Sequence, residues 1–184
     1  SRTAKHISEN MDTDPAFYKK FSDLLKETIA AYEQGRIDEV EYLKQVTQQM
    51  ESVISHTDSD IPAQIADNNT ARAYFGLCVE TLKSITNYET MFGVSQLRIT
   101  SKPITDIALE IALETDDIIR QYVLDDEKPI VDWHTKTNLI GKMKNEIEDY
   151  LIDEVKRKYE IPLTFDDMDN IIDRSVEVAK LWFK

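Results

Sequence analysis

The stretch that decides the fold of this chain is NLIGKMKNEIEDYLIDEVKRKY, residues 138–159, which is followed by Ile161-Pro162 and by a second periodic segment. In both segments apolar residues recur every three or four positions, which places them on one face of a helix. They are Leu139, Met143, Ile147, Tyr150, Leu151 and Val155 in the first segment, and Met168, Ile171, Ile172, Val176, Ala179, Trp182 and Phe183 in the second. Pro162 disfavours a helical conformation at Ile161 and so ends the first helix. The sequence therefore predicts an αα-hairpin whose inner faces need covering.

A second helical hairpin is predicted near the start of the chain. Asp14-Pro15 favours a helix start, because Asp is a good N-cap and Pro suits the first helical position. Gly35 predicts the end of that helix as a left-handed residue. Asp38 and Glu41 have the spacing of a capping box, and so short a turn makes the two helices antiparallel neighbours. The apolar stripes are Phe17, Phe21, Leu24, Leu25, Thr28 and Tyr32 on the first helix, and Val40, Leu43, Val46, Met50 and Val53 on one side of the second.

Two further helices complete the expected fold. One starts at Asn69, and the other starts between Ser101 and Thr105 and ends at Asp125-Asp126-Glu127. The sum is an all-α bundle of five to six helices, built from antiparallel helix hairpins. We expect residues 1–13 to be a linker or the remnant of a preceding domain, and residues 14–184 to form one helical domain. The pattern breaks after Gly93, so a subdivision near residues 94–102 is the alternative.

The composition excludes several classes of protein. The net charge is −13, and residues 105–184 hold 11 Lys+Arg against 20 Asp+Glu, a net of −9. Such a surface repels phosphate, which disfavours independent binding to nucleic acid. The uncharged runs are too short to span a bilayer, and no segment resembles a signal peptide, so a cytoplasmic protein is expected. The single cysteine, Cys78, excludes an internal disulfide and fits a reducing compartment.

The sequence contains only weak candidates for a metal site or a catalytic group. His56, Asp58 and Asp60 could ligate a cation, but they lack the glycine and the terminal Glu of a calcium loop, and a solvated linker is favoured. Cys78 falls on an apolar stripe, which favours a buried, inert thiol. His134 could pair with Asp132, but no nucleophile accompanies them.

The remaining motifs have structural explanations. The run Asp166, Asp167 and Asp169 is typical of a helix start, and this explanation is favoured over a metal site. Glu154 and Lys156 have the letters of a nuclease motif, yet their side chains diverge on a helix. Gly141 lacks the glycines of a phosphate-binding loop. We therefore expect no catalytic, cofactor or metal site in this chain.

Three features carry a resemblance to a known family. Asp132-Trp133 precedes a long helix that ends in Lys156-Arg157-Lys158, and Ile161-Pro162 precedes a last helix. This order resembles the C-terminal helical region of type I restriction enzyme R subunits. The run from Asp14 to Ser22 and the hairpin around Gly35 look like the start of the same region, so the resemblance covers about residues 10–180.

The resemblance implies a non-catalytic piece of a bacterial or archaeal type I site-specific deoxyribonuclease that uses ATP and magnesium elsewhere in its chain. In that family the helical region follows the motor domains and docks them onto the methyltransferase and specificity subunits, and DNA is reached through the whole complex. The family's catalytic residues lie upstream and do not carry over. The candidate interface residues are Asp132, Trp133, Lys156, Arg157, Lys158, Pro162 and Trp182. A module that guides DNA with Lys156, Arg157 and Lys158, or a structural brace beside the motor, is the alternative.

Overall fold

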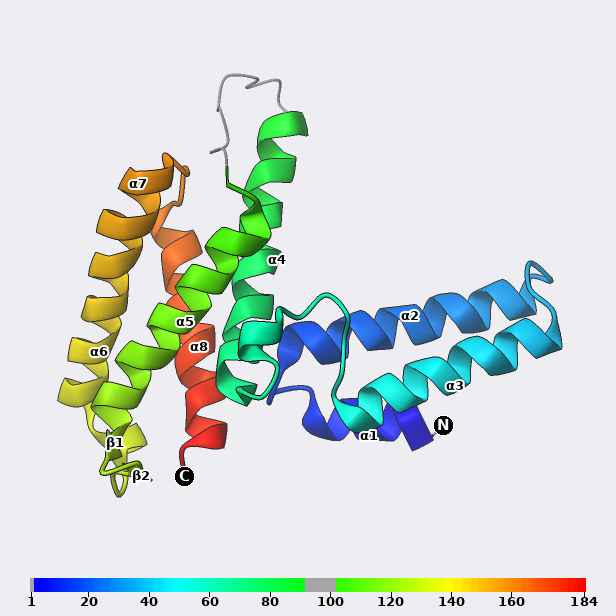
Figure 1. Ribbon diagram of the computed structural model, residues 1–184, viewed down its shortest axis with the longest axis horizontal. Coiled ribbons are helices and arrows are strands. Elements are labelled where there is room, and N and C mark those ends of the chain that lie inside the picture. The colour runs from blue at the N-terminus through cyan, green and yellow to red at the C-terminus, as the bar shows by residue number, and fades with distance from the viewer. Residues whose placement is uncertain (1, 92–101) are drawn as a thin grey trace. The chain divides into compact units, whose positions relative to one another are not determined.

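A computed structural model describes residues 2–91 and 102–184 of the chain and confirms the predicted all-α class (Figure 1). Apart from one short β-hairpin, the regular elements of these residues are helical. They are α1 (Arg2–Asn10), α2 (Pro15–Glu33), α3 (Glu39–Ser55), η1 (Ala63–Ile65), α4 (Asn69–Met91), α5 (Ile104–Val123), β1 (Leu124–Asp125), β2 (Lys128–Pro129), η2 (Trp133–Thr135), α6 (Thr137–Tyr150), η3 (Leu151–Lys156), α7 (Arg157–Tyr159) and α8 (Phe165–Trp182).

The chain divides into two compact units, residues 1–67 and residues 68–184. This division differs from the expected single domain of residues 14–184. Residues 1–13, expected to be a linker, contain helix α1, whose Ile7 is buried in the core of the first unit. The boundary falls where a polar loop ends and Asn68 caps the start of α4. A subdivision near residues 94–102 was the alternative, and all of these residues but Lys102 lie outside the described part of the chain.

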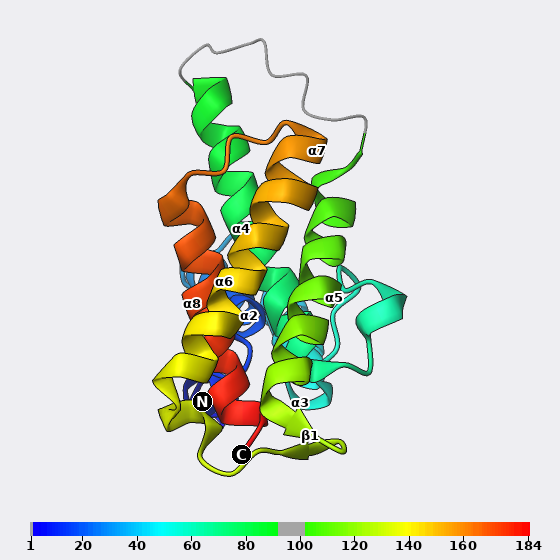
Figure 2. The same cartoon turned by 90° about the vertical axis from the view of Figure 1, so that its left-hand side faces the viewer.

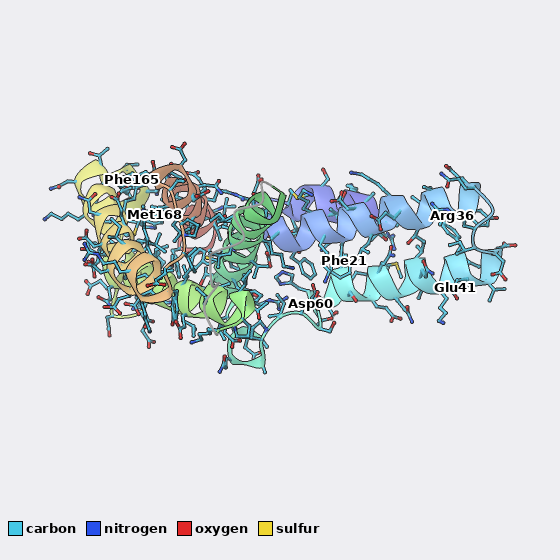
Figure 3. The ribbon with its side chains drawn as sticks, turned by 90° about the horizontal axis from the view of Figure 1, so that it is seen from above. Phe21, Arg36, Glu41, Asp60, Phe165 and Met168 are labelled. Carbon is cyan, nitrogen blue, oxygen red and sulfur yellow. The ribbon has the colours of Figure 1, made fainter. Side chains whose placement is uncertain are left out.

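The first unit is a helical hairpin with a small apolar core at one end. Asp14 caps α2 by accepting a hydrogen bond from the Phe17 amide, and Gly35 has φ +68°, as predicted. Figure 3 shows Phe21 between α2 and α3 at the end marked by Asp60, whereas Arg36 and Glu41 mark the turn end. The core consists of Ile7, Phe17, Tyr18, Phe21 and Val53.

The predicted apolar stripe of α3 is only partly buried. Val53 is buried, but Val40 is 77% exposed and Leu43 is 55% exposed. α3 instead turns polar residues toward α2, because the Gln49 amide donates a hydrogen bond of 2.8 Å to the Thr28 hydroxyl. The alternation of polar and apolar residues did not reveal which face of α3 meets α2.

The start of α3 also differs in detail from the predicted capping box. Asp38 accepts a hydrogen bond of 2.8 Å from the Glu41 amide, as expected of an N-cap. The Glu41 carboxylate does not supply the other half of the box. It accepts a bond of 2.7 Å from Gln45 in the next turn.

The second unit consists of α4, α5, the continuous helix α6–η3–α7, and α8, which run side by side (Figure 2). β1 and β2 form an antiparallel hairpin after α5. Its turn residues, Asp126 and Glu127, have φ of 48° and 61°, the left-handed values that a two-residue hairpin turn requires. Fully buried side chains from all four helices form the core, including Leu77, Ile111, Ile119, Ile147, Leu151 and Ile171.

The long helix predicted over residues 138–159 is continuous but not uniformly α-helical. Its buried residues follow one another at intervals of four: Met143, Ile147, Leu151, Val155 and Tyr159. On an α-helix each such step turns the side chain by about 40° away from the previous one. The segment η3 is π-helical, with the Arg157 amide bonded to the Ile152 carbonyl five residues earlier. A π-helix winds less per residue, so the late members of the series stay on the buried face.

A buried carboxylate connects α4 to α5. Asp116 is nearly inaccessible, yet it accepts hydrogen bonds from the Thr70 hydroxyl at 2.5 Å, the Asn68 amide at 2.7 Å and Arg120 Nε at 2.7 Å. Asn68 also caps α4 by accepting a bond of 3.1 Å from the Ala71 amide. The buried charge is thus fully engaged by its neighbours, which offsets the cost of removing it from water.

Replacing Asp116 by Ala should therefore destabilise the chain by about 2–4 kcal/mol, because Thr70, Asn68 and Arg120 lose their shared acceptor. Urea unfolding followed by circular dichroism measures the change. The neighbouring Asp117 is exposed, so Asp117→Ala is the matched control and should change stability by less than about 0.5 kcal/mol. Equal effects of the two substitutions would contradict the conclusion that the Asp116 carboxylate stabilises the second unit.

Candidate docking surface

The candidate interface residues separate into two groups at opposite ends of the second unit (Figure 1). Asp132, Trp133 and Trp182 lie at the end that carries the β-hairpin and the C-terminus. Lys156, Arg157, Lys158 and Pro162 lie at the end that carries α7. The seven residues therefore do not form one surface.

Trp133 binds the C-terminal end of the chain to the core of the second unit. Its side chain is 1% exposed, and its indole Nε1 donates a hydrogen bond of 2.7 Å to the Phe183 carbonyl. The Phe183 ring is also buried, and the Arg120 guanidinium lies over it at 5.0 Å from the ring centre. Asp132 directs the chain into η2 with a left-handed backbone, φ 55°. Trp133 is thus a core anchor and not an exposed contact.

Trp182 has a different environment. It is 38% exposed, and Leu181 beside it is 37% exposed. Val131, two residues before Trp133, is 78% exposed. We call Val131, Leu181 and Trp182 the C-terminal patch. Exposed Trp and aliphatic side chains next to a rigid core are typical of protein interfaces.

The basic cluster lies in the last turn of the long helix, as predicted. Arg157 forms an ion pair of 2.5 Å with Asp153, and Lys156 lies 5.9 Å from the centre of the Phe165 ring. A hydrogen bond to the Tyr159 hydroxyl raises the pKa of Lys158. The helix ends at Glu160, whose φ of 52° is left-handed, and Pro162 follows. These contacts support the explanation of the cluster as a helix terminus.

An open groove of about 430 Å³ lies beside this cluster, between α5 and the long helix. Four carboxylates face it against one lysine: Glu110, Glu114, Asp117 and Glu154 line it with Lys158, Leu113 and Tyr150. Burial, followed by the charges of Glu114 and Glu110, raises the pKa of the Tyr150 hydroxyl. Glu110 accepts hydrogen bonds from Lys102 and from the Tyr159 hydroxyl. The negative charge of the groove opposes phosphate binding next to the only basic cluster that the sequence analysis singled out.

Residues 56–60, in the loop after α3, bind to residues at the start of α2. His56 Nε2 lies 2.9 Å from an Asp14 carboxylate oxygen, and the ring stacks on Tyr18. Asp58 and Asp60 both accept hydrogen bonds from Lys20, at 2.6 and 2.7 Å. Although burial opposes it, the combined effect of these two carboxylates raises the pKa of Lys20. Most residues of this loop are exposed, as expected of a solvated linker, but His56, Asp58 and Asp60 are tied to the start of α2.

The other polar candidates are explained by helix geometry. Thr164 caps α8 by accepting a bond of 3.1 Å from the Asp167 amide, and Asp167 accepts one of 2.9 Å from the Thr164 amide. This reciprocal pair confirms the helix-start explanation for Asp167. His134 is exposed beside Trp133. Within the described residues, no group of three or more His, Cys, Asp or Glu side chains is arranged to hold a metal ion.

The Asp116 network and two residues of the C-terminal patch, Val131 and Leu181, were not predicted from the sequence. Asp116 sits among apolar residues of α5, and that position was the available signal of a buried carboxylate. Val131 and Leu181 gave no signal, because single exposed apolar residues are common on protein surfaces.

Comparison with known proteins finds no matching family model, no matching curated protein and no matching solved structure. In the part of the chain that the structure describes, no helix combines the length and the apolar character needed to cross a membrane.

The thiol of Cys78 should be unreactive in the folded chain. It is fully buried, and burial raises its pKa to about 12, so almost no thiolate exists at pH 8. Labelling with a chromogenic disulfide at pH 8 should be slow for the native chain and complete within minutes in urea. Labelling of the native chain as rapid as that of the unfolded chain would show that the thiol is accessible.

The two tryptophans should differ in their contribution to stability. Trp133→Ala should cost about 3–5 kcal/mol, because it opens a cavity and leaves the Phe183 carbonyl without its donor. Trp182→Ala should cost less, about 1–2 kcal/mol, because more than a third of the side chain is already exposed to water. Urea unfolding of both variants checks the difference. A large cost at Trp182 would remove it from the C-terminal patch.

Proposed function

We propose that this chain is the C-terminal helical domain of a type I restriction enzyme R subunit, and that it docks the motor part of that subunit onto the methyltransferase–specificity core. The observation that carries the proposal is the C-terminal patch, where Val131, Leu181 and Trp182 are exposed within two residues of Trp133 or Phe183, which are buried and hydrogen-bonded to each other. The order of motifs from Asp132 to Pro162, which resembles that family, supplies the identity of the partner. On this proposal, ATP and magnesium bind to other parts of the R subunit.

A rigid scaffold behind the patch supports a docking role. Trp133 binds the Phe183 carbonyl, and Arg120 covers the Phe183 ring while it is held by Asp116. The residue after Trp182 is therefore held from two sides. Because Trp182 is presented on an ordered backbone, binding would cost little conformational entropy.

The same geometry disfavours the DNA-guiding alternative. Arg157 is paired with Asp153, and the groove beside Lys158 carries four carboxylates. A phosphate backbone would have to displace these acids from the basic cluster, which costs electrostatic energy, most of all at low salt concentration. The structural brace remains the second candidate, since a brace needs no exposed patch and predicts no partner.

Association with the core complex tests the proposal. The chain should bind an immobilised methyltransferase–specificity complex, and Trp182→Ala should weaken that binding about tenfold or more, as expected for an aromatic hot spot. Phe165→Ala is the matched control, since Phe165 is an exposed aromatic residue at the other end of α8 and should leave binding unchanged. Binding that is absent, or that both substitutions weaken equally, would contradict docking through the C-terminal patch.

A further inference from the structure

The helix α3 carries an exposed apolar stripe that the first unit does not cover. Val40, Leu43 and Ile54 are 77%, 55% and 65% exposed, although Val, Leu and Ile prefer the protein interior. With Thr47 and the half-buried Met50 they follow one another at intervals of three, four, three and four residues. This is the spacing of the contact positions of a coiled coil.

The stripe is separate from the face that meets α2. Toward α2, the helix presents Gln49, whose side-chain amide donates a hydrogen bond to the Thr28 hydroxyl. It also presents Tyr42, whose ring stacks on that of Tyr32 with the ring centres 4.6 Å apart. Val53 alone is buried among the residues of α3. The contacts of the hairpin therefore leave the neighbouring stripe exposed at Val40, Leu43 and Ile54.

The charges beside the stripe are self-complementary. If Val40, Thr47 and Ile54 are assigned to position a of a heptad, Lys44 and Glu51 both fall at position e. In an antiparallel pair of helices, position e of one helix faces position e of the other. Two copies of α3 would therefore place Lys44 of each copy beside Glu51 of the second copy, which makes two equivalent ion pairs.

We propose that two copies of this chain associate through α3, packed antiparallel about a two-fold axis. Leu43 of each copy lies across from Ile54 of the second copy, and Thr47 and Met50 meet near the axis. A two-fold interface requires such a self-complementary surface. A parallel pairing would place Glu39 beside Lys44, but it would leave Glu51 next to the apolar Val46 and without a cation. It fits less well, because only the antiparallel pairing gives both charges at position e a partner.

The charges are available for this pairing. Within one chain Lys44 Nζ lies 3.8 Å from a Glu41 carboxylate oxygen, and the two side chains are 63% and 42% exposed. An exposed pair of this kind contributes little to stability, so Lys44 can exchange it for Glu51 of the second copy. The stripe belongs to the first unit and the C-terminal patch to the second, so the inference does not rest on the proposed docking function.

Charge reversal with sedimentation velocity tests the proposal on the whole 184-residue chain. The chain should form a concentration-dependent dimer in the micromolar range. Lys44→Glu and Glu51→Lys should each weaken the dimer about tenfold or more, because each places like charges at both pairs. The double variant should restore the original dissociation constant within about threefold.

Lys26→Glu is the matched control, since it makes the same charge change at an exposed position of α2 and should leave the dimer unchanged. Circular dichroism shows whether each variant is folded. A chain that stays monomeric at about 100 μM, or a double variant that is no better than the single ones, would overturn the proposal.

Cysteine cross-linking determines the direction of the two helices. The double variant Leu43→Cys/Ile54→Cys should form disulfide-linked dimers, whereas Leu43→Cys alone should not. The two positions are about 16 Å apart on one helix, so they cannot bridge within a chain. The native Cys78 is buried and contributes no background. Efficient cross-linking of Leu43→Cys alone would indicate parallel packing and contradict the proposal.

Discussion

The carboxylate of Asp116 is the interaction on which the second unit depends. A carboxylate in an apolar interior is stable only if donors surround it, and Thr70, Asn68 and Arg120 supply them. The first turn of α4 is thereby bound to the last turns of α5. Arg120 extends the connection to the ring of Phe183, whose carbonyl is bound by Trp133. A series of contacts thus runs from the start of the unit to its C-terminus.

The helices and most of their ends could be predicted because both depend on local chemistry. Asp14 and Gly35 act through bonds and backbone angles within a few residues. The face of α3 that meets α2 could not be predicted, because the polar contact of Gln49 with Thr28 depends on a residue 21 positions away. Asp116 was missed for the same reason, since the donors that make its burial tolerable lie in another helix.

The two proposed contact surfaces lie in different units and differ in their chemistry. The C-terminal patch is a small group of apolar side chains on a rigid scaffold, which suits a partner with a matching pocket. The stripe on α3 is long and has alternating charge beside it, which suits another helix. A chain with one surface of each kind could bind a second copy and a different partner at the same time.

The π-helical segment η3 has a consequence for the length of the chain. It holds about one residue more than an α-helix would need to cover the same turn. A deletion of one residue within Leu151–Lys156 could convert the segment to an α-helix while the residues on either side keep their faces. The same deletion in α6 would rotate every later residue by about 100° and expose the buried series that ends at Tyr159. A one-residue deletion in the interior of this long helix is therefore best tolerated within those six residues.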